Sequence, residues 1–246
     1  VQLAGGTQHL FFSGDSTFSS LRGLCSHAGD GHSIFVALPG QNSIVRISHD
    51  TPVQAHTVYA DSWTSVCGST YSPYDVLHDH VNNWLYVLCG KSNGGQIRRL
   101  DVTHGSAHVT LVNTLGNVEP QNWILSPNGI AAYVTCHKAG ANARVLKVIL
   151  TGSSAGTASI VGSDQGLLRE PRGLMFVEDD LYIQESTYFG LVGYRALSGR
   201  ASLGPMTVPI KLAQYPIEAV YRVDDGHIYS IHRAGELYKI QIVSQD

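Results

Sequence analysis

The chain has 246 residues, of which 43% are hydrophobic and 14% charged, and its formal net charge is −3. This much apolar material excludes a disordered chain, and the lack of any run of Lys or Arg argues against nucleic acid and anionic membrane surfaces as partners. No apolar run approaches the roughly 18 residues that a membrane-spanning helix needs, so we expect no membrane span. All-β domains often use this much chain, and we expect a single domain over residues 1–246.

A segment with strand character, residues 9–12, comes first and stands ahead of a pattern that recurs five times along the chain. Each repeat opens with Pro or Leu and a short apolar run, at residues 21–24, 73–76, 120–123, 171–174 and 216–219. A turn of the Asp-Gly or Asn-Asn kind, which suits positive φ or an Asx bend, follows each opening. A period of roughly fifty residues is typical of a propeller or a solenoid.

Further β-rich segments follow each turn. Second strands with an aromatic or branched centre are predicted at residues 34–36, 85–87, 132–134, 181–183 and 228–230. Third strands, which mix a basic residue with apolar ones, are predicted at residues 44–47, 97–100, 145–148, 192–195 and 237–240. Fourth strands are predicted at residues 56–59, 109–112, 158–161 and 208–211. No window shows a sustained helical period, so we expect an all-β fold.

The fifth repeat reaches Asp246 before a fourth strand, whereas residues 9–12 form a strand that belongs to no repeat. We therefore expect a five-bladed β-propeller of four-stranded antiparallel blades, in which the N-terminal strand completes the last blade. Such closure protects the edge of a blade that would otherwise be open. Because four-stranded blades often need only about 40–45 residues, six blades are the alternative.

The Pro-x-Gly-Leu opening, the turn, the Leu-Tyr-Val strand and the strand that carries a basic residue resemble the NHL, YVTN and lactonase-like β-propellers. Residues 171–174 and 181–186 carry the resemblance best. The resemblance implies an architecture for the whole chain. It does not choose a function, because that superfamily includes lactonases, lyases and pure binding modules.

In enzymes of that kind, metal ligands occupy the second position of the opening. The residues at this position are Arg22, Tyr74, Gln121, Arg172 and Ile217. None is a histidine or a carboxylate, so neither the three-histidine zinc site nor the calcium site is reproduced in this register. One residue later, Asp75, Asn122 and Glu218 form an oxygen set that suits calcium. The alternative is that these three bind the backbone where blades meet. Because successive strand residues point to opposite sides, we expect only one of the two registers to face the channel fully.

The loops that enter the first strands and the loops that leave the second strands share one face, which is the predicted functional face. Arg22 and Arg172 would place two guanidinium groups near the channel mouth, with Tyr74 between blades and Gln121 in the same register. Guanidinium pairs suit a carboxylate, a phosphate or an acidic sugar. The alternative is that each arginine pairs with an acidic neighbour such as Asp75 or Glu218.

Aromatic residues of the loops on this face supply a second kind of candidate. Trp63 and Tyr188 can stack on a sugar, although a lone loop aromatic also serves as a packing plug. His232 ends the fifth second strand on the same face and completes the predicted ligand-binding set.

The second strands end at equivalent positions, which are Leu38, Cys89, Cys136, Glu185 and His232. Cys67 lies in the long connection over residues 61–72 and can reach Cys89. A Cys89–Cys136 disulfide requires Cα atoms within ~7 Å, and a zinc set of Cys89, Cys136, His137 and His232 is a further alternative. Four cysteines with few lysines favour a secreted protein, with a reduced cytosolic protein as the alternative.

The leading hypothesis is a secreted, non-catalytic propeller that binds a carbohydrate, a small anionic ligand or a partner protein through the channel-mouth face. It needs no cofactor, although calcium at Asp75, Asn122 and Glu218 stays open. The alternatives are a metal-dependent, lactonase-like hydrolase or lyase and a structural subunit of an extracellular assembly.

Overall fold

The computed structural model describes the following parts of the chain: residues 22–27, 33–48, 66–79, 82–91, 94–102, 108–112, 115–116, 119–137, 143–163, 168–177, 180–185, 190–194, 207–211, 216–222, 227–232 and 237–241. These residues are almost wholly β-strand, with one short 3₁₀ helix at Pro39–Gln41. The predicted all-β class is therefore confirmed. No helix in the described ranges has the length and apolar character that crossing a membrane requires.

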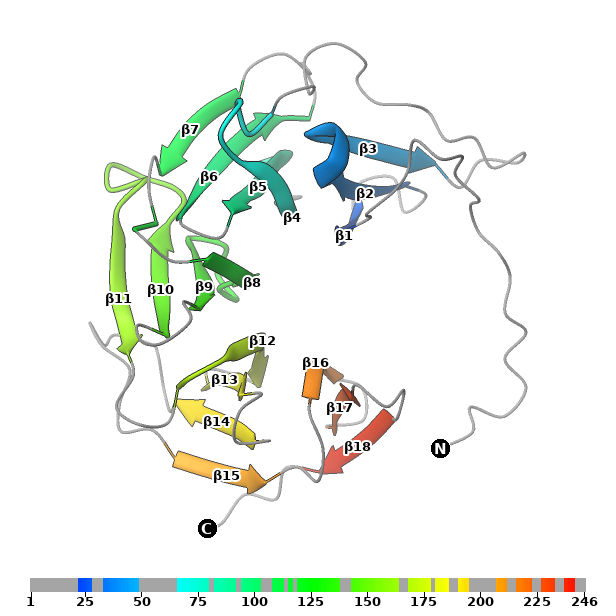
Figure 1. Ribbon diagram of the computed structural model, residues 1–246, viewed down its shortest axis with the longest axis vertical. Coiled ribbons are helices and arrows are strands. Elements are labelled where there is room, and N and C mark those ends of the chain that lie inside the picture. Colours follow the sequence, from blue (N-terminus) through cyan, green and yellow to red (C-terminus); the bar gives the residue numbers. More distant parts are fainter. Residues whose placement is uncertain are drawn as a thin grey trace. The chain divides into compact units, whose positions relative to one another are not determined.

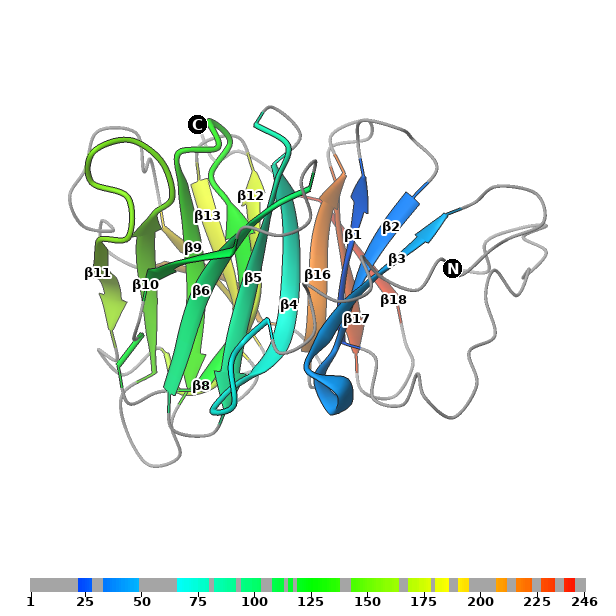
Figure 2. The ribbon, with the colours of Figure 1, turned by 90° about the horizontal axis from the view of Figure 1, so that it is seen from above.

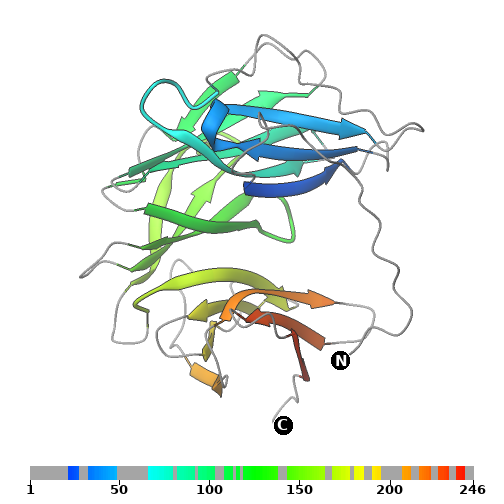
Figure 3. The same ribbon diagram turned by 45° about the vertical axis from the view of Figure 1, so that its right-hand side comes forward.

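The chain divides into two compact units at Pro120 and Gln121, which we call the N-terminal and C-terminal units. The N-terminal unit contains a three-stranded sheet in the order β1-β2-β3 and a four-stranded sheet in the order β4-β5-β6-β7. Their bounds are β1 (Arg22–His27), β2 (Ser33–Leu38), β3 (Ser43–Ser48), β4 (Ser72–Asp79), β5 (Trp84–Lys91), β6 (Gly94–Asp101) and β7 (His108–Val112). The first strands of the two sheets, β1 and β4, lie side by side (Figure 3).

The C-terminal unit contains the remaining three sheets, in the orders β8-β9-β10-β11, β12-β13-β14-β15 and β16-β17-β18 (Figure 1). The strands of the first sheet are β8 (Glu119–Leu125), whose first two residues belong to the N-terminal unit, β9 (Ala131–His137), β10 (Arg144–Ile149) and β11 (Ala158–Ser163). The others are β12 (Pro171–Val177), β13 (Asp180–Glu185), β14 (Gly190–Tyr194), β15 (Thr207–Lys211), β16 (Pro216–Arg222), β17 (His227–His232) and β18 (Leu237–Gln241).

Each sheet is an antiparallel meander in which neighbours in sequence are neighbours in space, as the strands β4, β5 and β6 show in Figure 2. The turns behave as the sequence predicts: Asn83 and Gly129 have φ of 54° and 69°, the left-handed region that Asn and Gly tolerate best. The predicted fourth strands at 109–112, 158–161 and 208–211 are confirmed as parts of β7, β11 and β15. The segments 9–12 and 56–59 lie outside the described residues, so blade count and closure remain predictions.

Apolar side chains of neighbouring sheets form the core of each unit. In the N-terminal unit, Phe35 and Ile44 of the first sheet pack with Val76, Leu85 and Val87 of the second. In the C-terminal unit, a corresponding cluster joins the sheet that begins with β8 to the sheet that begins with β12; its members include Tyr133, Val145, Leu174, Leu181 and Ile183. All of these side chains are at most 5% exposed. Burial of such side chains contributes about 1.5–3 kcal/mol each.

The first strands of four sheets contain a β-bulge where the repeat opens. The register shifts between Arg22 and Leu24 in β1, between Pro73 and Asp75 in β4, between Pro171 and Leu174 in β12, and between Pro216 and Glu218 in β16. A bulge sets two residues against one on the neighbouring strand and breaks the strict alternation of side chains. Strict alternation therefore does not hold at these openings, and the expectation that only one of the two registers faces the channel fully stays a prediction. In β4, both Tyr74 and Asp75 are half-buried.

Candidate functional site

Arg172 is the centre of a polar cluster in the C-terminal unit. It follows Pro171 in β12, inside the bulge that sets Arg172 and Gly173 against Gln184 of β13. Its Nη1 donates to Oε1 of Gln121 in β8 at 2.9 Å, and its Nη2 forms an ion pair with the carboxylate of Glu170. The Arg172 side chain is nevertheless 38% exposed. The guanidinium group is thus held in place from two sides and still reaches solvent.

The side chain of Thr135 in β9 contacts the backbones of β8 and β12, the two strands that contain Gln121 and Arg172. Its side chain is fully buried, and its Oγ1 accepts the backbone N–H of Asn122 at 3.1 Å. The same oxygen lies 3.1 Å from the carbonyl oxygen of Asn122 and 3.0 Å from that of Arg172, so its one proton can be donated to either. The hydroxyl therefore couples β8 to β12 beside Gln121 and Arg172. Thr135 was not among the predicted site residues, although it stands in an otherwise largely apolar run over residues 131–136.

Glu185, the last residue of β13, fixes the segment that leads into β12. Its side chain is fully buried, and its carboxylate accepts the backbone N–H of Arg169 at 2.9 Å and that of Glu170 at 2.9 and 3.0 Å. A buried carboxylate is tolerated when backbone N–H groups bind it in this way. Because Glu170 is held through its backbone, its side chain is positioned to meet Arg172.

In the N-terminal unit, the predicted site residues of β4 also contact their neighbours. Tyr74 donates its hydroxyl to Oε1 of Glu119 at 3.4 Å. One oxygen of Asp75 accepts the backbone N–H of Val76 at 2.8 Å. This contact lies within β4 itself, so the predicted alternative, in which Asp75 binds the backbone where blades meet, stays a prediction.

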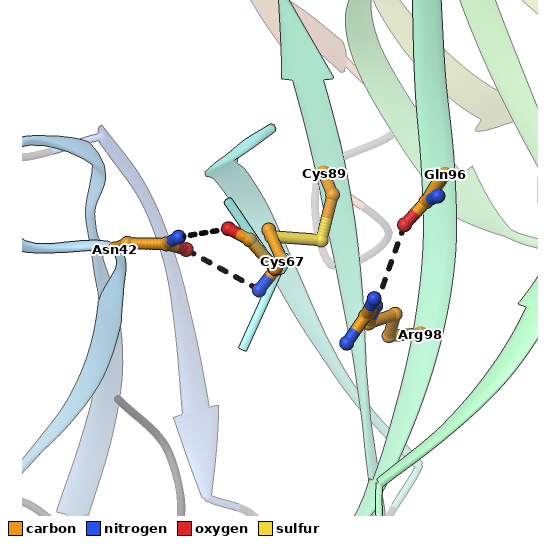
Figure 4. The surroundings of a disulfide bond; sticks show 6 residues. Asn42, Cys67, Cys89, Gln96 and Arg98 are labelled. Carbon is orange, nitrogen blue, oxygen red and sulfur yellow. Dashed lines mark hydrogen bonds between the residues drawn. A yellow bond between two sulfur atoms is a disulfide. The ribbon is translucent and has the colours of Figure 1, made fainter. Parts of the chain in front are cut away.

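A disulfide joins Cys67 to Cys89 in the same unit, with a Cα–Cα distance of 5.5 Å. The bond confirms the predicted reach of Cys67. Figure 4 shows that the side chain of Asn42 holds the Cys67 turn on its other side: its Oδ1 accepts the N–H of Cys67 at 3.2 Å, and its Nδ2 donates to the carbonyl of Gly68. The side chain of Arg98 lies near this turn and donates to Gln96, and burial lowers the pKa of its guanidinium group.

The Cys67–Cys89 disulfide and the hydrogen bonds of the Glu185 carboxylate lie at equivalent positions of two sheets. We call the Glu185 hydrogen bonds the Glu185 clamp. Both the disulfide and the clamp anchor the chain segment that leads into a first strand. Cys89 is paired with Pro73 and Glu185 with Pro171, so each ends a second strand opposite the opening proline of a first strand. Each binds the segment that precedes this proline, through a covalent bond in one sheet and through backbone N–H groups in the other. Equivalent positions of the repeat therefore anchor the entry to a first strand by different chemistry.

The other cysteine of the described residues does not take part. Cys136 is a free, fully buried thiol, and burial raises its pKa to about 12. The Cys89–Cys136 disulfide and the zinc set that used both cysteines are therefore wrong, because Cys89 is already bonded to Cys67. Within the described ranges, no three His, Cys, Asp or Glu side chains gather to hold a metal ion.

The structure places the predicted ligand-binding residues unevenly. It brings Gln121 and Arg172 together, and it places Tyr74 in the other unit. Arg22 and His232 lie in β1 and β17, but their side chains are outside the described part of the molecule. Trp63 and Tyr188 also lie outside it.

The predicted calcium ligands are divided in the same way. Asp75 belongs to the N-terminal unit, whereas Asn122 and Glu218 belong to the C-terminal unit. The side chain of Glu218 is outside the described residues. The predicted calcium set therefore remains a prediction.

Comparison with known proteins identifies the fold. No family model matches the sequence, and no curated protein matches it. Among solved structures, the nidogen/laminin complex contains a chain that aligns with a TM-score of 0.61 at 17% identity, over 90% of this chain and 80% of that one. A catalytically inactive virginiamycin B lyase from Staphylococcus aureus, solved with quinupristin, aligns with a TM-score of 0.63 at 13% identity, over 94% of this chain and 72% of that one.

A gluconolactonase from Xanthomonas campestris aligns with a TM-score of 0.57 at 14% identity, over 80% of this chain and 64% of that chain. The similar structures are β-propellers of the NHL and lactonase-like type, and the resemblance seen in the sequence is confirmed at the level of architecture. Similarity at this low identity shows the fold alone.

Proposed function

We propose that this chain is a non-catalytic binding propeller that recognises a carboxylate- or phosphate-bearing ligand at Arg172. The observation that carries the proposal is the guanidinium group of Arg172, which Gln121 and Glu170 hold in place while the side chain stays 38% exposed. A planar guanidinium presents several N–H donors in a fixed fork, which matches the oxygens of a carboxylate or a phosphate. The Gln121 contact, which remains when a ligand takes the place of Glu170, fixes the fork in advance and lowers the entropy lost when the ligand binds.

The two neighbours of Arg172 have different roles in this proposal. Gln121 is neutral and orients the guanidinium group without cancelling its charge. The carboxylate of Glu170 forms an ion pair with the guanidinium group, so it occupies a position that the ligand would take. The ligand must displace Glu170, whose side chain is 23% exposed and has solvent to move into. Removing the Glu170 charge is therefore expected to strengthen ligand binding.

A metal-dependent activity is the alternative, and the contacts around Arg172 do not favour it. Oε1 of Gln121 and Oε1 of Glu170 both accept hydrogen bonds from the guanidinium group. A calcium ion bound by these oxygens would lie beside a positive charge that repels it. The alternative therefore depends on Asp75, Asn122 and Glu218. Calcium analysis of the purified protein tests it, since a stoichiometric ion lost together with stability on chelation would favour the enzyme.

Among the similar structures, the chain from the nidogen/laminin complex comes from an assembly of two proteins, which supports a binding role on this fold. The Cys67–Cys89 disulfide supports an oxidising compartment, and we include secretion in the proposal. We also include five blades closed by residues 9–12, supported by the five successive meanders among the described strands.

Calorimetric titration with inorganic phosphate, D-glucuronate and D-glucose tests the proposal. We expect binding of one or both anions and none of glucose, with Arg172→Ala abolishing it and Glu170→Gln increasing affinity severalfold. Arg169→Ala is the matched control, because it removes the same charge from an exposed residue three positions away while its backbone N–H still binds Glu185. The proposal would be contradicted if Arg169→Ala and Arg172→Ala lowered the affinity for the anions equally, or if the wild-type chain bound neither anion.

A further inference from the structure

The strand β11 (Ala158–Ser163) forms the outer edge of its sheet (Figure 1). Among the described strands, only β10 pairs with it. Its first residues, 158–160, are exposed, and Ile160 has 53% of its surface in solvent. Backbone hydrogen bonds close the hairpin that leads into β11. The N–H of Ile149 donates to the carbonyl of Thr157 at 2.9 Å, and the N–H of Gly156 donates to the carbonyl of Ile149 at 2.8 Å. The edge is therefore a regular strand, and no other strand of the described ranges pairs with its outer side.

The sequence of this edge lacks the charged residues and prolines that usually prevent strand pairing between molecules. Residues 151–163 contain no charged residue and no proline. Natural edge strands are usually protected by lysine, proline or a bulge. The outer strand of the next sheet, β15, contains both Pro209 and Lys211. In β11 only a bulge is present, opposite the step from Val145 to Leu146, and it leaves Ile160 exposed.

We propose that β11 pairs in antiparallel fashion with β11 of a second copy of this chain. Two copies related by a two-fold axis place the same strand against itself, which is the isologous arrangement of most dimers. An uncharged strand can pair with itself without bringing like charges opposite each other. In this pairing Ile160 of each copy lies near its counterpart, and the two exposed side chains bury each other.

The small size of this contact sets the strength of the association. One six-residue strand on each side gives an interface well below the ~1,200 Å² of a stable complex, so we expect a weak, concentration-dependent dimer. The contact is independent of Arg172, because it uses the fourth strand of a sheet and not the entry to a first strand. A failure of this proposal therefore leaves the ligand-binding proposal untouched.

Sedimentation velocity over a hundredfold range of protein concentration tests the dimer. We expect the sedimentation coefficient to rise toward that of a dimer for the wild-type chain and to stay at the monomer value for Ile160→Lys. Ile130→Lys is the matched control: Ile130 is 48% exposed and lies in a turn of the same sheet, not on its edge. This variant should associate as the wild type does. Circular dichroism establishes that both variants are folded.

Three results would overturn the proposal. The wild-type chain stays monomeric at every concentration, or Ile160→Lys still dimerises, or both lysine variants lose association equally, which would indicate general apolar adhesion. Hydrogen exchange gives a second readout, since the amides of residues 157–163 should become more protected as the protein concentration rises. Unchanged protection there in a dimeric sample would place the contact elsewhere.

Discussion

Replacing Glu185 by glutamine is expected to lower the free energy of unfolding, because Glu185 anchors the segment that leads into β12. The carboxylate is fully buried and binds the N–H groups of Arg169 and Glu170 at 2.9 to 3.0 Å. Glutamine keeps one acceptor oxygen but turns its NH₂ group toward the other N–H, so one charge-assisted hydrogen bond is lost and one donor is left unsatisfied. We expect a loss of about 2–3 kcal/mol. For a chain of this size, this corresponds to a fall in Tm of roughly 4–12 °C.

Thermal unfolding followed by calorimetry measures the effect, and hydrogen exchange locates it at the amides of Arg169 and Glu170. Glu170→Gln is the matched control in the same segment, because it changes a half-buried side chain and leaves the backbone N–H in place. Its loss should stay below about 1 kcal/mol, as for other surface ion pairs. If Glu185→Gln unfolds within a degree of the wild-type chain, or if only Glu170→Gln is destabilised, the reasoning about the clamp is refuted.

Three further predictions concern other parts of the molecule. Removing the disulfide with Cys67→Ala and Cys89→Ala should cost about 3 kcal/mol, because the bond closes a loop with a sequence separation of 22 residues; a Tm within 2 °C of the wild type would contradict this. Gly90→Ala should destabilise the N-terminal unit by roughly 1–3 kcal/mol in urea unfolding, because a Cβ there would lie 2.8 Å from Cγ of Pro120. An unchanged urea midpoint would argue against this contact. Burial raises the pKa of Cys136 to about 12, so its thiol should resist iodoacetamide at pH 9 in the native protein and react after unfolding; rapid native labelling would show that the thiol is accessible.

The strands could be predicted from the sequence because the repeat combines turn residues with short runs of β-formers. The openings at 73–76, 120–123, 171–174 and 216–219 fall within β4, β8, β12 and β16. The Cys67–Cys89 bond was foreseeable for a related reason. Cys67 precedes the strand whose Pro73 is paired with Cys89, so the repeat register already places the two cysteines at the same end of the sheet.

The bulges could not be predicted, because they depend on how two strands pair and not on the composition of either strand. In β4 the register shifts between Pro73 and Asp75, so the alternation rule does not assign sides to Tyr74 and Asp75, and both are half-buried. The role of Glu185 was hidden for a similar reason: its partners are backbone N–H groups of a loop, and a loop conformation has no periodicity to read. For Arg172, the sequence pointed to an acidic neighbour in another strand, but the structure supplies Glu170 from two residues earlier in the chain.

A crystal structure of the protein with D-glucuronate or inorganic phosphate tests the central claim most directly. The proposal predicts ligand oxygens within hydrogen-bond distance, about 2.7–3.2 Å, of the Arg172 guanidinium group, with Gln121 still bound to it and the Glu170 side chain turned away. A ligand bound elsewhere, with Glu170 still paired to Arg172, would contradict it.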